Sequence, residues 1–208
     1  MSEGNVGIRS VLKFPSVYDL YQWLVGSRAA RDRLFRTYVS FPEGCKLLDI
    51  GCGSGELLEY LPSHVRYTGV DVNPLYIELA RKKYGNQGRF ELIDVNDIES
   101  LDLPKNNFDV VVLYGVLHHL NDGEVRGVLS FARMMLKLGG TVFTVDGVYL
   151  KDQSRIKKFI LSRDRGAFVR FNYQYQKLAR EVFPDVETFV ERNALRIPTD
   201  YFVMRMTK

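Results

Sequence analysis

The ten residues KLLDIGCGSG, from Lys46 to Gly55, decide the fold of this chain. Lys46–Ile50 is a short, mostly apolar run, which is typical of a buried strand in a parallel sheet. Glycines at positions 51, 53 and 55 follow directly, and glycine lets a backbone turn sharply and approach a ligand closely. The stretch Glu56–Leu61 then predicts a helix that ends before Pro62. A strand, a glycine loop and a helix in this order indicate an α/β protein with a ligand site at the loop.

The rest of the chain alternates apolar runs with amphipathic stretches, which predicts a sheet covered by helices on both faces. Further strands are expected at 67–72, 90–94, 108–114 and 141–145, followed by closing strands at 186–191 and 201–206. Asn73 and Pro74 begin a helix that runs to Tyr84, and another runs from Asn121 to the glycine pair at 139–140. The pattern therefore predicts a seven-stranded sheet, mostly parallel, that ends in a C-terminal antiparallel hairpin.

The chain is long enough for one domain with a sizeable core, because 46% of its 208 residues are hydrophobic. We expect a single domain over 1–208, made of an N-terminal helical cap (1–45), a ligand-binding core (46–147), a basic segment (148–183) and closing strands (184–208). The apolar residues expected to share one face of the cap helix are Val17, Leu20, Tyr21 and Leu24.

The charge and the cysteine content limit which partners and which cellular compartment we expect. The net charge is +4, and the basic segment alone holds nine basic and three acidic residues, so the basic character describes a partner of one segment. No run approaches the roughly 18 apolar residues of a membrane span, and the first fifteen residues lack the apolar stretch of a secretory signal. The only cysteines, Cys45 and Cys52, suit a reducing compartment. We expect a cytoplasmic protein.

The spacing of the glycine loop separates possible ligands. A dinucleotide fingerprint needs glycine or alanine at position 56, where this chain has Glu56. A carboxylate at the start of the helix would oppose a pyrophosphate. A Walker-type phosphate loop is also excluded, because no Gly-Lys-Ser/Thr follows. The residues match instead the pattern D-x-G-x-G-x-G, starting at Asp49.

With this pattern the chain resembles the class I S-adenosylmethionine-dependent methyltransferases, from about Lys46 to Met206. The resemblance implies a Rossmann-like seven-stranded methyltransferase sheet and S-adenosylmethionine as cofactor. It assigns Asp49 and the glycines to the methionine end, Asp71 to the ribose hydroxyls and the 94–95 pair to the adenine. Carboxylates at the ends of buried strands are costly unless they have partners, which supports the first two assignments. The cofactor-binding residues expected are Asp49, Gly51, Cys52, Gly53, Gly55, Asp71, Val72, Asp94, Val95, Leu113 and Tyr114.

Catalytic and acceptor-binding residues are expected outside the glycine loop. His118 and His119 follow the 108–114 strand, and either could remove a proton from an acceptor, although one could simply brace the loop. Arg155, Arg163 and Arg165 could clamp a phosphate or carboxylate, or form a solvated helix face. No metal site is predicted. The last third is similar to a bacterial subgroup associated with surface-polysaccharide genes, which implies a sugar or anionic acceptor.

Three functions remain open at this level. A small-molecule methyltransferase is favoured, with oxygen preferred over nitrogen as the acceptor atom. An RNA methyltransferase is the alternative, because aromatic residues interleave the basic segment and could stack on bases. A non-catalytic cofactor-binding module is the third. Amino methylation of adenine is disfavoured, since Leu113–Val116 lacks the Asn/Asp-Pro-Pro-aromatic sequence that such enzymes carry at this place.

Overall fold

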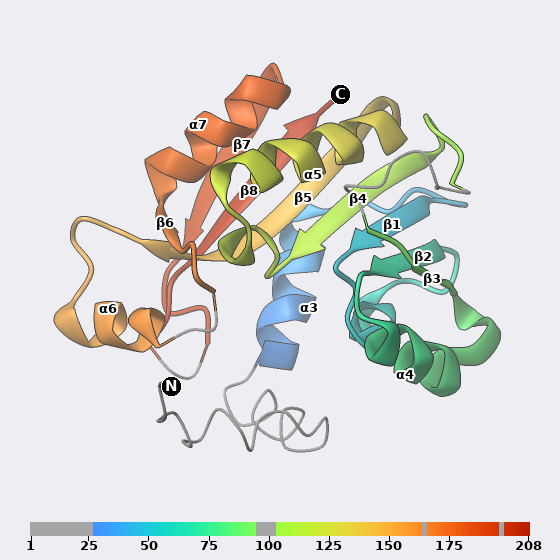
Figure 1. Cartoon of the computed structure of the whole chain (residues 1–208), viewed down its shortest axis with the longest axis horizontal. Coiled ribbons are helices and arrows are strands. Elements are labelled where there is room, and N and C mark those ends of the chain that lie inside the picture. Colours follow the sequence, from blue (N-terminus) through green and yellow to red (C-terminus); the bar gives the residue numbers. More distant parts are fainter. Residues whose placement is uncertain (1–26, 95–102, 164–165, 196–197) are drawn as a thin grey trace, which may run out of the picture.

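A seven-stranded sheet forms the centre of the computed structural model, which describes residues 27–94, 103–163, 166–195 and 198–208 (Figure 1). Its strand order is β3-β2-β1-β4-β5-β8-β7, and a two-residue strand, β6, lies beside the end of β5. The strands are β1 (Lys46–Ile50), β2 (Arg66–Asp71), β3 (Arg89–Leu92), β4 (Phe108–Tyr114), β5 (Leu136–Tyr149), β6 (Arg170–Phe171), β7 (Asp185–Glu191) and β8 (Tyr201–Thr207). Strands β1 to β5 are parallel to one another, and β8 is antiparallel to both β5 and β7. The predicted mixed sheet with a closing hairpin is confirmed.

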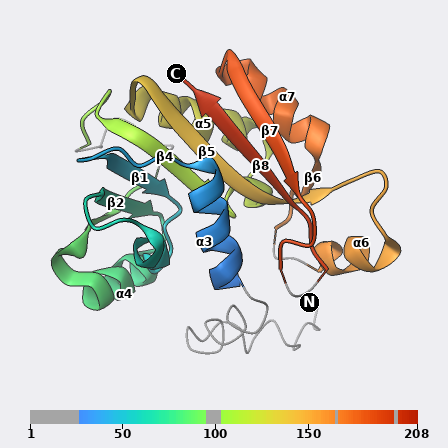
Figure 2. The same cartoon turned by 180° about the vertical axis from the view of Figure 1, so that it is seen from behind.

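Helices cover both faces of the sheet, as Figures 1 and 2 show from opposite sides. One face carries α5 (Asp122–Met135) and α7 (Asn172–Val182); the other carries α3 (Ser27–Tyr38), η1 (Glu56–Tyr60) and α4 (Pro74–Tyr84). Short helices η2 (Gly85–Gln87) and η4 (Leu117–His119) follow α4 and β4, and α6 (Arg155–Ser162) follows β5. In β4, Val111 packs into the α5 side while Val110 and Val112 pack into the α3 side. This two-sided burial explains the continuous apolar run of β4.

Local capping explains where the helices beside the site begin. The side chain of Asn73 accepts the Leu75 N–H at 3.0 Å, one residue before Pro74. The side chain of Asn121 accepts the Glu124 N–H at 3.0 Å, and Glu124 returns a bond to the Asn121 N–H at 2.7 Å. The Asn121 cap lies just after η4, so it also fixes the loop that carries His118 and His119.

Two sequence expectations about local structure are wrong. The helix from Asn121 ends at Met135 instead of at the glycine pair, and β5 already begins at Leu136 and runs through Gly139 and Gly140. Tertiary contacts set this boundary: Leu136 pairs with Phe108 and is fully buried in the core. The stretch after the first glycine loop, expected as an ordinary helix, is the five-residue 3-10 helix η1.

The predicted helical cap and the basic segment are described in part. The face formed by Val17, Leu20, Tyr21 and Leu24 lies outside the described residues, and α3 is the described helix of the 1–45 region. The 148–183 segment contains the end of β5, then α6, β6 and α7, of which α7 packs beside α5. No helix in the described ranges is both long enough and apolar enough to cross a membrane.

Replacing Asn121, the N-cap residue of α5, should lower the stability of the fold. Asn121→Ala removes the acceptor for the Glu124 N–H, so we expect the free energy of unfolding to fall by about 1 kcal/mol. Urea denaturation followed by circular dichroism measures this change. Asn86→Ala, at an exposed asparagine in η2, is the control and should stay within about 0.5 kcal/mol of wild type. Equal stabilities of the two variants would show that the cap contributes nothing.

Candidate functional site

The glycine loop is anchored to the end of β2. The N–H groups of Gly51 and Cys52 both donate to the Val70 carbonyl, at 2.8 and 3.0 Å. The Gly53 N–H donates to Asp71 Oδ2 at 2.9 Å. The loop therefore bends over the carboxyl end of β2, and Asp71 holds it there.

The glycines of the loop are required for two different reasons, although all three have positive φ: 73° at Gly51, 54° at Gly53 and 79° at Gly55. A β-carbon at Gly51 would lie 2.7 Å from Val116, and one at Gly55 would lie 2.7 Å from the Phe90 ring. A β-carbon at Gly53 would meet nothing within 4 Å. Gly53 is therefore the point of the loop that opens onto free space, where a ligand can reach the backbone.

Asp71 faces this opening with acceptor capacity left on both oxygens. Oδ2 accepts the Gly53 N–H, and Oδ1 accepts the Asn73 N–H at 2.8 Å. A carboxylate oxygen accepts about two hydrogen bonds, so each can take one more. This geometry fits a pair of neighbouring hydroxyls. Val72 is largely exposed beside it, and Asp94 is exposed after β3, whereas Val95 lies outside the described residues.

Asp49 is a buried acid one strand away. Its side chain is 3% exposed, and Tyr67 donates its hydroxyl to Oδ2 at 2.7 Å. Burial raises the pKa of Asp49 to about 7, while the Tyr67 hydrogen bond and the charge of Arg31 oppose the rise. A cationic group placed beside Asp49 would favour its ionised form.

Arg31 of α3 is a site residue that the sequence did not reveal. Its guanidinium lies 4.7 Å from the centre of the Tyr114 ring, and its Nη1 is 3.4 Å from Glu56 Oε2. The Arg31 Nε is buried and has no hydrogen-bond partner. Arg31 precedes the buried Leu34 and Phe35 by three and four residues, so it shares their helix face. An arginine on an apolar stripe was the available signal.

Together these residues fit the cofactor that the resemblance implies. Arg31 has an unused buried donor for a carboxylate, and Asp49 offers an acceptor for an ammonium group. Asp71 can take two ribose hydroxyls, and Gly53 leaves space for the ligand between the two ends. Tyr114 contributes its ring below Arg31, whereas Leu113 is fully buried in the core on the α5 side and Cys52 is buried on the other.

The histidine pair lies at the same edge of the sheet. His118 Nδ1 is 2.8 Å from Asp146 Oδ1, and the His118 backbone N–H donates to the same oxygen at 3.1 Å. The ring centres of His118 and His119 are 4.2 Å apart. Val116, two residues earlier, is the side chain that packs against Gly51. The structure therefore brings the predicted histidines next to the glycine loop and adds Asp146 of β5, which the sequence had not indicated.

Arg170 holds in place the loop between β4 and α5 that carries His118 and His119 (the histidine loop). It is buried and donates to the carbonyls of Leu117 and Leu120 at 2.9 and 2.7 Å. It also binds Asp122 Oδ1 through two nitrogens, at 2.9 and 2.7 Å. One of the nine basic residues of the 148–183 segment is thus used inside the protein. Lys157 is another, since its Nζ lies 2.5 Å from the buried Asp200.

The predicted acceptor-binding arginines differ in placement. Arg155 begins α6 and Arg163 directly follows its last residue; both are exposed, as are Ile156 (66%) and Phe159 (59%) of the same helix. The Arg163 guanidinium lies 5.1 Å from the centre of the Phe159 ring. Arg165 lies outside the described residues. Cationic groups on α6 thus accompany an apolar surface rather than a closed pocket.

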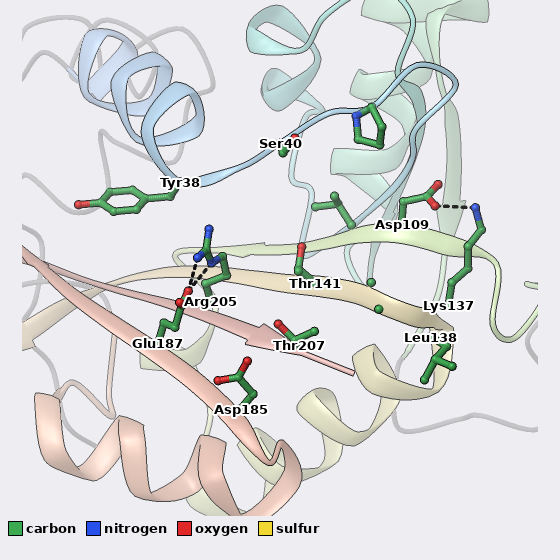
Figure 3. Close-up of a pocket in the computed structure, with 14 residues that line it drawn as sticks. Tyr38, Ser40, Asp109, Lys137, Leu138, Thr141, Asp185, Glu187, Arg205 and Thr207 are labelled. Atoms are coloured by element: carbon green, nitrogen blue, oxygen red, sulfur yellow. Dashed lines mark hydrogen bonds and ion pairs between the residues drawn. The ribbon is translucent and has the colours of Figure 1, made fainter.

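A groove of about 530 Å³ occupies the opposite edge of the sheet (Figure 3). It is lined by the starts of β4, β5 and β7 and the end of β8. Its cations are neutralised within the groove, Lys137 by Asp109 at 2.6 Å and Arg205 by Glu187. None of the predicted site residues that the structure describes lines it. Ligands of open α/β sheets bind at the carboxyl ends of the strands, so we assign the site to the glycine-loop edge. Among the described residues, no cluster of acidic, histidine or cysteine side chains could hold a metal ion.

Known proteins with similar sequences are methyltransferases. A model of the methyltransferase domain family matches residues 48–142. The ubiquinone biosynthesis O-methyltransferase of Methylocella silvestris is 34% identical over 102 residues, which are 49% of this chain and 39% of that protein. The malonyl-(acyl-carrier protein) O-methyltransferase of a Paenibacillus species is 32% identical over 110 residues, again 49% of this chain and 39% of that protein. The chain thus spans well under half the length of these two relatives.

Solved structures show the same fold. Phosphoethanolamine N-methyltransferase 2 of Haemonchus contortus, in complex with S-adenosyl-L-methionine, matches with a TM-score of 0.72 at 17% identity, over 100% of this chain and 61% of that chain. An Archaeoglobus fulgidus S-adenosylmethionine-dependent methyltransferase matches with a TM-score of 0.69 at 20% identity, over 92% and 99% of the two chains. The fold is that of the Rossmann-like methyltransferases. Within this fold, residues 48–142 match the methyltransferase domain family.

Substitutions in the glycine loop should separate packing from ligand binding. Gly55→Ala places a β-carbon against the Phe90 ring, so we expect a loss of about 1–3 kcal/mol of stability. Gly53→Ala meets open space, so we expect only the roughly 1 kcal/mol cost of the left-handed backbone. Gly53→Ala should instead weaken S-adenosylhomocysteine binding. Thermal unfolding and calorimetry measure the two effects, and a more destabilised Gly53→Ala variant would contradict this geometry.

Removing the Asp49 charge should stabilise the protein without ligand in a pH-dependent way. The folded-state pKa is raised to about 7, so ionisation disfavours folding as pH rises from about 4 to 7, and the loss persists above that range. The amide side chain of the Asp49→Asn variant carries no charge, so the variant should gain up to about 4 kcal/mol over wild type at about pH 8 and little near pH 4. Urea unfolding across pH tests this. Asp185→Asn, at an exposed carboxylate, should show no such trend.

Proposed function

We propose that this chain transfers a methyl group from S-adenosylmethionine to a small-molecule acceptor, with oxygen as the favoured acceptor atom. The observation that carries the proposal is the row formed by Arg31, Asp49, Gly53 and Asp71 along one edge of the sheet. Two opposite charges at one end and a two-acceptor carboxylate at the other match an amino-acid group joined to a ribose. S-adenosylmethionine supplies an activated methyl group on a sulfonium centre.

The protein's own residues then act by holding and orienting. Arg31 binds the carboxylate of the amino-acid end, and Asp49 binds its ammonium group, which favours the ionised form of Asp49. Asp71 accepts the two ribose hydroxyls while it keeps Gly53 in place. Transfer by in-line displacement depends mainly on keeping acceptor, methyl and sulfur aligned at close range. The rigid loop and Asp71 serve this alignment.

Three features support a small acceptor with an oxygen nucleophile. The histidine loop lies beside the glycine loop through the contact between Gly51 and Val116, so a base stands close to the cofactor edge. Both curated relatives named above are O-methyltransferases by name. The exposed Arg155 and Arg163 of α6 add positive charge on the side of the sheet where β5 ends. A sugar hydroxyl or an anionic metabolite suits this setting.

The RNA alternative is weakened by how the 148–183 segment is used. Arg170 is buried and paired with Asp122, and Lys157 is paired with the buried Asp200. Tyr175 is almost fully buried, so it cannot stack on a base. Exposed Phe168 and Tyr173 remain as stacking surfaces. An RNA acceptor therefore becomes an outcome of the acceptor screen and not the leading hypothesis.

Calorimetric titration with S-adenosylmethionine and S-adenosylhomocysteine tests the cofactor site. We expect wild type to bind both, and Asp71→Ala to bind at least about tenfold more weakly, a loss of about 1.4 kcal/mol. Asp71→Asn keeps an acceptor for the Gly53 N–H, so it separates loop bracing from hydroxyl binding. Asp185→Ala, at the remote groove, is the control and should bind as wild type does. A folded wild type that binds neither compound would end the proposal.

The acceptor class can be screened with methyl-labelled S-adenosylmethionine. Hexose phosphates, phenols, dicarboxylates and short RNAs are the probes, and product is detected by transfer of the label. Arg155→Ala and Arg163→Ala should raise KM for anionic probes and leave neutral ones unchanged. Cofactor binding without transfer to any probe would favour the non-catalytic module.

A further inference from the structure

A buried carboxylate on β5 is bound to His118 at two points. Asp146 Oδ1 lies 2.8 Å from the His118 Nδ1 and accepts the His118 backbone N–H at 3.1 Å. The Asp146 side chain is almost fully buried, and its Oδ2 is buried without a hydrogen-bond partner. Burial raises the pKa of Asp146, and the two His118 donors oppose the rise. A charged group in such a place is costly unless its partner is fixed.

The hydrogen bonds define which ring nitrogen carries the proton. Asp146 Oδ1 already accepts one N–H from the His118 backbone, so it acts as an acceptor. An ionised carboxylate only accepts, which requires the proton on Nδ1 of His118. In a neutral imidazole the other nitrogen, Nε2, then holds the lone pair. Free histidine favours the opposite tautomer, so Asp146 selects the less common form.

The surroundings hold the ring in one orientation. Gly166 lies directly against it, because a β-carbon at this position would be 2.2 Å from His118 Cδ2. The Phe168 N–H donates to the His118 carbonyl at 2.9 Å, and the His119 ring is its neighbour at 4.2 Å. Arg170 binds the carbonyl of Leu117, the residue before His118. These contacts together fix the orientation of the His118 ring, and among them Asp146 determines which ring nitrogen carries the proton.

We propose that Asp146 is a positioning residue that keeps His118 in the Nδ1–H tautomer, so that Nε2 takes the proton of a hydroxyl acceptor. This inference rests on the proposed function. The acceptor O–H bond breaks and its proton goes to Nε2. The oxygen forms a bond to the methyl carbon as the carbon–sulfur bond breaks, and that electron pair stays on sulfur. The resulting imidazolium lies against Asp146 and later returns the proton to water.

A histidine base in this position distinguishes hydroxyl acceptors from carboxylate acceptors. A carboxylate is already deprotonated at neutral pH and needs no base. A sugar or phenolic hydroxyl keeps its proton, so an oriented histidine contributes to its rate by roughly 10²–10⁴-fold. Asp146 and His118 therefore point to a hydroxyl acceptor instead of a carboxylate acceptor.

The tautomer of His118 can be measured without an acceptor. The chain has three histidines, so His64→Gln and His119→Gln assign the long-range ¹H–¹⁵N spectrum. We expect neutral His118 of wild type as the Nδ1–H tautomer, and Asp146→Asn to shift it toward Nε2–H. Asp200→Asn, at a buried aspartate that binds Lys157, should leave the tautomer unchanged. An Nε2–H tautomer in wild type would overturn the proposal even if Asp146→Asn failed to fold.

Kinetics with matched probes provide the functional arm. We expect transfer to glucose 1-phosphate or catechol, and none to succinate. With the methylated probe, Asp146→Asn should lower kcat by about 10²-fold or more, change the pH profile, and leave KM and S-adenosylhomocysteine affinity near wild type. Unchanged kcat and pH profile, or methylation of succinate alone, would overturn the inference. Absence of cofactor binding by wild type would instead refute the proposed function, and the tautomer result would stand apart from it.

Discussion

The hydrogen bond between the Gly53 N–H and Asp71 Oδ2 is the interaction on which the site depends. It joins the loop after β1 to the end of β2, and parallel strands bring these two ends to one edge. Because Asp71 also accepts the Asn73 N–H, one side chain fixes both the glycine loop and the start of α4. The order of the strands then places β4 and β5, with His118 and Asp146, beside them.

Charge burial explains why this edge is suited to a ligand and not to stability alone. Arg31 has a buried Nε without a partner, Asp49 has a pKa raised to about 7, and Asp146 has a buried, unpaired Oδ2. Each arrangement is unfavourable for an isolated fold. They lie on three separate elements, α3, β1 and β5, which converge where the parallel strands end. Their placement is understandable if a charged ligand and a moving proton complete them.

Much of the fold could be predicted because its signals are local. The run 46–50, the apolar β4 and the Asn73-Pro74 helix start each depend on a few adjacent residues, and all three occur as expected. The start of β5 could not be predicted, because Leu136 leaves the helix to pair with Phe108, a contact made 28 residues apart. The same holds in the site: the glycine loop is one continuous motif, while Arg31 and Asp146 act through neighbours that are distant in sequence. Asp146 also lies in an apolar strand where nothing local marks it as a partner of His118.

The contacts that hold the histidine loop are separate from the exposed surface of the 148–183 segment. The 148–183 segment contacts His118 through the backbone at Gly166 and Phe168, and its Arg170 binds the carbonyl of Leu117, the residue before His118. Its outward residues on α6, including Ile156 and Phe159, take no part in those contacts. Variation on that outer helix can therefore change the exposed surface of the segment while the His118 ring stays in place. The segment combines a fixed inner attachment with an outer surface that is free to diversify, an arrangement well suited to directed evolution of acceptor preference.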